Sequence, residues 1–199
     1  LDSPHSGIRD RERRVFFQLP QGMQHPHTPA HIPLPEIGED QHPVFNGLMQ
    51  IAPKWQDIEW MIANTSLPVI LKGIVHPKDA ERAVQSGVQG LIISNHGGRV
   101  LDSCISPLNA LQRIKAVVSQ HFPLIVDGGI RRGSDIFKAI ALGASAVCIG
   151  RPYIHGLAVA GALGVAHVIK ILKEEFEITM ALAGTATLKE ITSDYIFHK

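Results

Sequence analysis

Short apolar runs alternate with amphipathic segments from residue 54 onward, and this rhythm restricts the chain to α/β folds with parallel strands. We expect strands over residues 1–3, 67–72, 90–94, 123–126 and 146–149. We expect helices over residues 55–64, 76–86, 107–119, 133–142 and 161–183. Strand–helix units joined by right-handed crossovers build either an open doubly wound sheet or a (β/α)8 barrel.

The strand ends favour the barrel. No Gly-x-Gly-x-x-Gly follows an expected strand, so the dinucleotide-binding fingerprint is missing. The last two strands run instead into Asp127-Gly128-Gly129 and Gly150-Arg151, at the place where barrels often bind a phosphate. Because five strands cannot close an eight-stranded barrel, we expect the C-terminal part of a TIM barrel, about strands 4 to 8.

An incomplete barrel would leave apolar strand edges unpaired, and such edges invite aggregation. We therefore expect residues 1–199 alone to be poorly soluble and inactive, with the missing strands supplied by upstream sequence. The chain starts at Leu1 without a methionine or a signal peptide, which agrees with this expectation.

Composition narrows the classes of function. The chain has 199 residues, of which 45% are apolar, and a formal charge of +1, so we expect a globular protein and no nucleic-acid partner. Two cysteines make no disulfide framework, and the histidines show no metal-ligand spacing. We expect no membrane span, because no apolar run approaches the roughly 20 residues that one needs.

A proline-rich segment interrupts the strand–helix rhythm. Residues 18–43 contain six of the thirteen prolines and show neither helical nor strand periodicity. Proline fixes φ and donates no backbone hydrogen bond, so we expect a long irregular loop over about residues 15–53. A loop of this length commonly forms a lid over a binding site.

A polar or charged side chain follows every expected strand. In chain order these residues are Asp2, Lys72, Ser94 with His96 and Arg99, Asp127 with Arg131, and Arg151. Because the carboxyl ends of barrel strands meet at one mouth, the pattern predicts a ligand site. Glycines at 128 and 129 would let backbone N–H groups approach an anion, and the last two arginines suit a phosphate monoester.

His96 and Arg99 are the most reactive pair of that set. The histidine can exchange a proton near neutral pH, and the arginine offers a fixed fork for a carboxylate. An isolated His-x-x-Arg is more often a buried histidine beside a loop arginine, but here the other strand ends support a site. Lys72 would stabilise an anionic ring, or simply keep its charge in solvent at a strand end.

Six motifs in this order resemble the C-terminal half of the FMN-dependent α-hydroxy acid oxidases and dehydrogenases, the family of glycolate oxidase and lactate oxidase. They are Asp2-Ser3-Pro4 with Gly7 and Arg9, Trp55-Gln56-Asp57-Ile58-Glu59-Trp60, Leu71-Lys72-Gly73, Ser94-Asn95-His96-Gly97-Gly98-Arg99, Asp127-Gly128-Gly129-Ile130-Arg131, and Gly150-Arg151-Pro152. Val100 and Ser103 replace the family's usual Gln and Gly.

The resemblance implies bound FMN and oxidation of an L-2-hydroxy acid to a 2-oxo acid, with O2 as the expected electron acceptor. It implies that His96 is the active-site base with Asp2 as its carboxylate partner, and that Arg9 and Arg99 bind the substrate with His96. The implied cofactor ligands are Lys72 at the flavin N1/O2 edge, Ser94 at the flavin, Asp127 at the ribityl chain, Gly129, Arg131, Gly150 and Arg151 at the phosphate, and Gly128 and Ile130 beside them.

The resemblance also implies a homo-oligomer, a tetramer in the family, in the cytoplasm or the peroxisome. The family's N-terminal half, with its substrate-binding tyrosine, is not among these residues. Two alternatives remain open on the sequence alone. The chain could be an inactive barrel remnant, or another phosphate-binding barrel enzyme such as a sugar-phosphate isomerase or a relative of inosine-monophosphate dehydrogenase.

Overall fold

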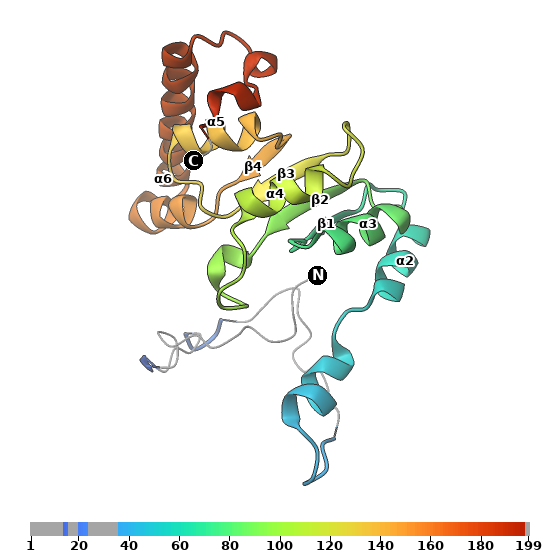
Figure 1. The fold of residues 1–199 in the computed structure, drawn as a ribbon. Helices are drawn as coiled ribbons and strands as arrows, with labels where there is room; N and C mark the ends of the chain where they lie inside the picture. Colours follow the sequence, from blue (N-terminus) through green and yellow to red (C-terminus); the bar gives the residue numbers. More distant parts are fainter. Residues whose placement is uncertain (1–13, 16–19, 24–35, 198–199) are drawn as a thin grey trace.

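A four-stranded parallel sheet forms the centre of the computed structural model, which describes residues 14–15, 20–23 and 36–197 (Figure 1). The strands are β1 (Ile70–Lys72), β2 (Gly90–Ser94), β3 (Leu124–Asp127) and β4 (Ala146–Cys148). Their spatial order is β1-β2-β3-β4, so each new strand is added at the same edge. In a doubly wound sheet the strand order reverses at a switch point. The strand order of this sheet does not reverse, which agrees with the predicted partial barrel.

Among the described residues, five α-helices flank the strands, and four of them lie close to the expected positions. They are α2 (Trp55–Ala63), α3 (Pro77–Gln85), α4 (Pro107–Lys115), α5 (Gly133–Ala141) and α6 (Arg151–Ala183). Side-chain caps start two of them: His76 Nδ1 accepts the Lys78 N–H at 3.2 Å, and Ser106 Oγ accepts the Asn109 N–H at 3.3 Å. The expected strand over residues 1–3 lies outside the described residues.

The two faces of the sheet differ because successive strand residues point to opposite sides. On the first, which we call the helix face, the strand residues are buried under α3 and α4; they are Leu71, Leu91, Ile93, Leu124 and Val126. The alternate residues form the second, which we call the inner face because it would point at the axis of a closed barrel. Its members are Ile70, Lys72, Ile92, Ser94, Ile125, Asp127, Ala146 and Cys148.

The last helix differs from its prediction, since it begins at Arg151 rather than near residue 161. Its backbone is not helical at Ala160 and Gly161, where Gly161 has φ 57°, so two helical segments meet at a bend. They cross at two glycines: a Cβ added to Gly156 or to Gly164 would collide with the carbonyl of the other. Pro152 in the first turn suits a helix start.

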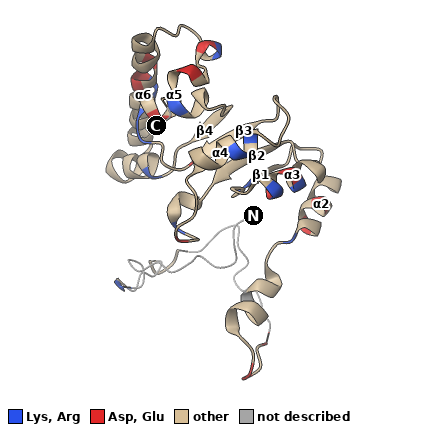
Figure 2. Ribbon diagram, in the orientation of Figure 1, with Lys and Arg blue, Asp and Glu red and all other residues tan. Residues whose placement is uncertain are grey.

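One helix bears on the expectation that no apolar run has membrane length. The helix Arg151–Ala183 is long and apolar enough to cross a membrane by length and composition, with a mean hydropathy of 1.6 over its most apolar window. Charged residues concentrate after Lys170, so any such window includes the bend at Ala160 and Gly161. Charges of both signs lie on α5 and α6 (Figure 2).

Short helical turns complete the description. A π-helical turn, η1 (Pro43–Gly47), and a 3-10 turn, η2 (Leu48–Ile51), lie in the segment expected to be an irregular lid. Three further 3-10 turns are η3 (His96–Gly98), η4 (Leu188–Glu190) and η5 (Ser193–Tyr195). A second small core joins the end of the chain to α5, where the Tyr195 ring packs edge-on against Phe137 at 5.6 Å.

Candidate active site

Three polar side chains meet where β1, β2 and β3 end. Ser94 Oγ donates a hydrogen bond to Asp127 Oδ2 at 2.5 Å, and Lys72 Nζ lies 3.5 Å from the same oxygen. Strand register explains the meeting, because Ser94 lies directly opposite Asp127 across the β2–β3 pairing. The Ser94 residue is 2% exposed, while the Lys72 side chain is 39% exposed. The sheet thus presents a buried hydroxyl and a partly exposed carboxylate beside a cation that solvent can reach.

The turn after β2 is tied to this cluster. The His96 backbone N–H donates to Ser94 Oγ at 3.0 Å, and His96 has φ 54°, a left-handed conformation that is uncommon for a non-glycine residue. Asn95 fixes the rest of the turn, because its Oδ1 accepts the Gly98 N–H at 3.2 Å and its Nδ2 donates to the Ile105 carbonyl at 3.3 Å. Backbone held in a sparse conformation by such contacts is typical of functional sites.

Arg151 brings the end of β4 to the same turn. It is the first residue of α6, and its Nη2 donates to the Gly97 carbonyl at 2.9 Å. A Cβ at Gly97 would lie 2.7 Å from that Nη2 atom, so a side chain there would displace the guanidinium group. Arg99 follows the turn and is exposed. The ends of β2 and β4, which are not neighbours in the sheet, are therefore joined through this arginine and the histidine turn.

The glycine turn after β3 leaves open space over its backbone. Gly129 has φ 81°, and a Cβ added there or at Gly150 would meet no atom within 4 Å. Gly128, in contrast, lies against Pro107 and Asn95, at 3.4 Å and 3.5 Å from an added Cβ. Arg131 is exposed beyond this turn. Open backbone flanked by arginines fits an anionic group such as a phosphate.

One predicted site residue can act only through its backbone, and two others lie outside the described residues. The Ile130 side chain is 4% exposed and packs in the core, so only its backbone can face a ligand, and its expected role is restricted accordingly. Asp2 and Arg9 lie outside the described residues, so their roles remain predictions.

Cys148 is a site neighbour that sequence reasoning missed. It pairs with Asp127 across β3 and β4, on the inner face. Burial raises the pKa of the Cys148 thiol, and the nearby Asp127 charge raises it further, against a smaller opposing effect of Lys72. The thiol is therefore neutral at neutral pH. In the sequence, Cys148 follows an apolar run and cannot be distinguished from an ordinary buried strand residue.

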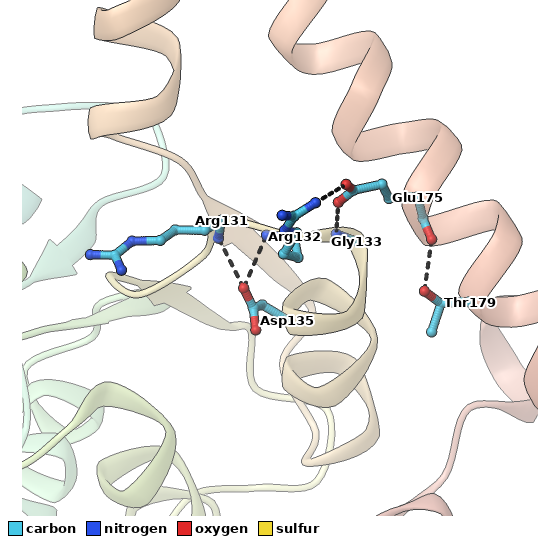
Figure 3. A network of polar contacts seen from close by, with 6 residues as sticks. All are labelled: Arg131, Arg132, Gly133, Asp135, Glu175 and Thr179. Atoms are coloured by element: carbon cyan, nitrogen blue, oxygen red, sulfur yellow. Dashed lines mark hydrogen bonds and ion pairs between the residues drawn. The ribbon is translucent and has the colours of Figure 1, made fainter.

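Asp135 and Glu175 are two further carboxylates near the glycine turn. Asp135 Oδ2 accepts the backbone N–H groups of Arg131 and Arg132, each at 3.0 Å (Figure 3). Glu175 on α6 accepts the Gly133 N–H at 2.9 Å. The Asp135 contact was foreseeable, because an acidic residue in the first helical turn is a capping signal. The Glu175 contact joins segments too far apart in sequence to be foreseen.

Comparison with known proteins identifies what this arrangement resembles. The chain is 46% identical to an L-lactate oxidase of Roseobacter sp. (strain GAI101) over 98% of its length and 54% of that protein. It is 52% identical to the peroxisomal (S)-2-hydroxyacid oxidase GLO3 of Arabidopsis thaliana over 71% of its length and 39% of that protein. The chain thus spans about half the length of the relatives it matches.

Solved structures agree with the sequence relatives. A mandelate oxidase crystallised with (S)-2-phenylpropionate superposes with a TM-score of 0.77 at 39% identity, over 96% of this chain and 51% of that one. The pattern of the FMN-dependent dehydrogenases matches residues 1–198. On these grounds, and with the strand-end cluster in the expected place, the chain belongs to the FMN-dependent dehydrogenase family.

Proposed function

We propose that the full-length protein containing this chain oxidises an L-2-hydroxy acid to a 2-oxo acid with bound FMN and passes the electrons to O2. The observation that carries the proposal is the cluster of Lys72, Ser94 and Asp127, joined through a backbone hydrogen bond to His96. It lies at the carboxyl ends of adjacent parallel strands, where barrels place their chemistry. The relatives named L-lactate oxidase and (S)-2-hydroxyacid oxidase support the same reaction.

The residues present fit FMN. Lys72 would lie at the N1/O2 edge of the flavin, where a cation stabilises negative charge. Ser94 would contact the flavin and Asp127 the ribityl chain, while Arg131 and Arg151 would bind the phosphate over the open backbone of two glycines, Gly129 and Gly150. When bound, FMN supplies an acceptor for two electrons.

The chain's own residues would handle the substrate. We assign His96 as the base that takes the proton of the 2-hydroxyl group, with Asp2 as its carboxylate partner. Arg99 would hold the substrate carboxylate in its guanidinium fork, assisted by Arg9. The hydrogen bond from the His96 N–H to Ser94 Oγ holds the turn that carries His96 against the end of β2, which would bind the cofactor. Holding the base and the substrate in place in this way accounts for much of such a rate enhancement.

The proposal extends to partners and compartment. We propose a homo-oligomer whose barrel is completed by upstream sequence, located in the cytoplasm or the peroxisome. A relative named as a peroxisomal oxidase supports an intracellular compartment. Residues 15–53 would form the lid over the substrate.

The test is the full-length protein, purified without added cofactor. We expect a yellow protein with flavin absorbance that forms a 2-oxo acid and H2O2 from L-lactate, glycolate or (S)-mandelate in air. Turnover with an artificial acceptor under nitrogen, but not with O2, would change the acceptor to another molecule. A folded, colourless protein that does not take up FMN would support the inactive remnant instead.

A further inference from the structure

Two neighbouring arginines leave the glycine turn in different directions. Figure 3 shows the Arg131 side chain pointing away from the carboxylates that surround the turn. The Arg132 side chain points toward α6, where its Nη1 lies 2.8 Å from Glu175 Oε1. Adjacent residues of the same type therefore have different partners, and Arg132 is occupied by an ion pair within the protein.

The backbone of the same turn is bound by the two carboxylates. Asp135 accepts the N–H groups of Arg131 and Arg132, and Glu175 Oε2 accepts the next one, from Gly133. Three consecutive donors thus point away from the open side of the turn. Charge-assisted bonds of this kind are shorter and stronger than neutral ones, so the turn has little freedom to rotate.

Close packing adds to these bonds. A Cβ at Gly133 would collide with the backbone of Glu175 and Phe176, so the turn lies directly against α6. The Gly133 N–H, and after it the Arg132 side chain, lower the pKa of Glu175 below its ordinary value. Glu175 is therefore charged at neutral pH, as both of its bonds require.

We propose that Glu175 and Asp135 are positioning residues for the cofactor phosphate: they hold the turn from behind so that Arg131 faces the phosphate. This inference rests on the proposed function, because it takes the phosphate of FMN as the ligand of Arg131. Neither carboxylate touches the ligand. They act through the turn, and the ion pair to Glu175 keeps Arg132 from competing for the phosphate.

Riboflavin, which is FMN without its phosphate, separates positioning from general stability. Apoprotein of the full-length chain is titrated with FMN and with riboflavin, and the dissociation constants are read from flavin fluorescence. We expect Glu175→Gln to weaken FMN about tenfold, the size typical of an outer partner of a bound group, and to leave riboflavin affinity unchanged. Asp135→Asn should behave in the same way.

Glu177→Gln is the matched control. It makes the same chemical change on the same helix, at a residue that pairs with Lys173 on the exposed side. Both flavin affinities should stay at the wild-type values. If Glu175→Gln weakens FMN and riboflavin equally, its role is structural only, and the inference is wrong.

A double variant tests whether the carboxylate acts through Arg131. In an Arg131→Ala background, Glu175→Gln should cause almost no further loss of FMN affinity, because the positioned group is already gone. A full tenfold loss in that background would overturn the inference. Should Glu175→Gln fail to fold, Arg132→Gln removes one of the two bonds to Glu175 and should weaken FMN alone by a smaller factor.

One comparison distinguishes failure of this inference from failure of the proposed function. Wild-type protein that binds FMN no more tightly than riboflavin has no phosphate site, and both the proposed function and the inference then fail. Wild-type protein that prefers FMN, with the same preference in Glu175→Gln, overturns the inference alone.

Discussion

The two faces of the sheet are built from the same strands and do different work. On the helix face, Leu91, Ile93 and Val126 have no exposed surface, because the chain's own helices cover them. On the inner face, Ile70 is 44% exposed, and polar residues replace apolar ones where the strands end. One face therefore supplies stability, and the other supplies chemistry at its carboxyl edge.

This difference shows how alternation along a strand separates the residues needed for stability from those needed for chemistry. Lys72 and Leu71 are neighbours in sequence, yet one joins the site and the other is 8% exposed in the core. A substitution on one face should therefore leave the property of the other almost unchanged. The predictions below test that separation, in the full-length protein, from the largest expected effect to the smallest.

His96→Gln should abolish turnover and leave both FMN and folding stability in place. Loss of a general base costs at least about 10²-fold in rate, and up to about 10⁴-fold. Stopped-flow reduction of the flavin by L-lactate measures the effect, and the thermal midpoint serves as control. Flavin reduction at the wild-type rate would exclude His96 as the base.

Leu111→Ala, in the helix α4 that covers the helix face, should give the opposite result. Leu111 has no exposed surface, so its truncation leaves a cavity and lowers the free energy of unfolding by about 3 kcal/mol. The Michaelis constant and the rate per folded molecule should stay at wild-type values. Denaturant unfolding measures the stability, and a changed Michaelis constant would show that the two faces are coupled.

Arg151→Ala should weaken FMN binding by roughly 1.5–3 kcal/mol, the size of a charge-assisted hydrogen bond. It should also slow turnover slightly, because the guanidinium donates to the Gly97 carbonyl in the histidine turn. Equilibrium dialysis followed by flavin absorbance measures the retained cofactor. Wild-type stoichiometry after dialysis would remove Arg151 from the phosphate site.

The smallest effect is on pH dependence. The pKa of Glu175 is lowered in the folded protein, so its contribution to stability is present above its ordinary pKa of 4.5 and is lost as the pH falls below it. Glu175→Gln removes that titration. The difference in thermal midpoint between wild type and variant should therefore shrink between about pH 6 and about pH 3. A constant difference over that range would mean that Glu175 is not the group that titrates.

Strand positions and the polar residues at the strand ends could be predicted because each rests on local chemistry. An apolar run ending at Lys72 or Asp127 specifies both a buried strand and a polar end, and the register of β2 and β3 then brings Ser94 to Asp127. Strand lengths were less accurate: β1 begins at Ile70 rather than at 67, since Pro68 cannot donate a ladder hydrogen bond.

Contacts between distant segments could not be predicted in this way. Arg132 and Glu175 are 43 residues apart, and nothing in either local pattern specifies the other. The first segment of α6 was missed for a similar reason, because the prediction began the helix at the bend, near Gly161, and not at Arg151. Where tertiary contact decides the conformation, the local pattern is insufficient.

The glycine crossing in α6 has a geometrical consequence for the cofactor. Gly156 lies about 7.5 Å along the helix from Arg151. The first segment can therefore tilt about the contact between Gly156 and Gly164, and Arg151 would move with it. Gly164→Ala would push the segments apart, and a tilt of about 10° would swing the arginine by roughly 1 Å. Such a displacement would be measured as weaker FMN binding. A methyl group remote from the ligand would then lower the affinity of the site for FMN, so the spacing of the two helical segments would help to set cofactor affinity.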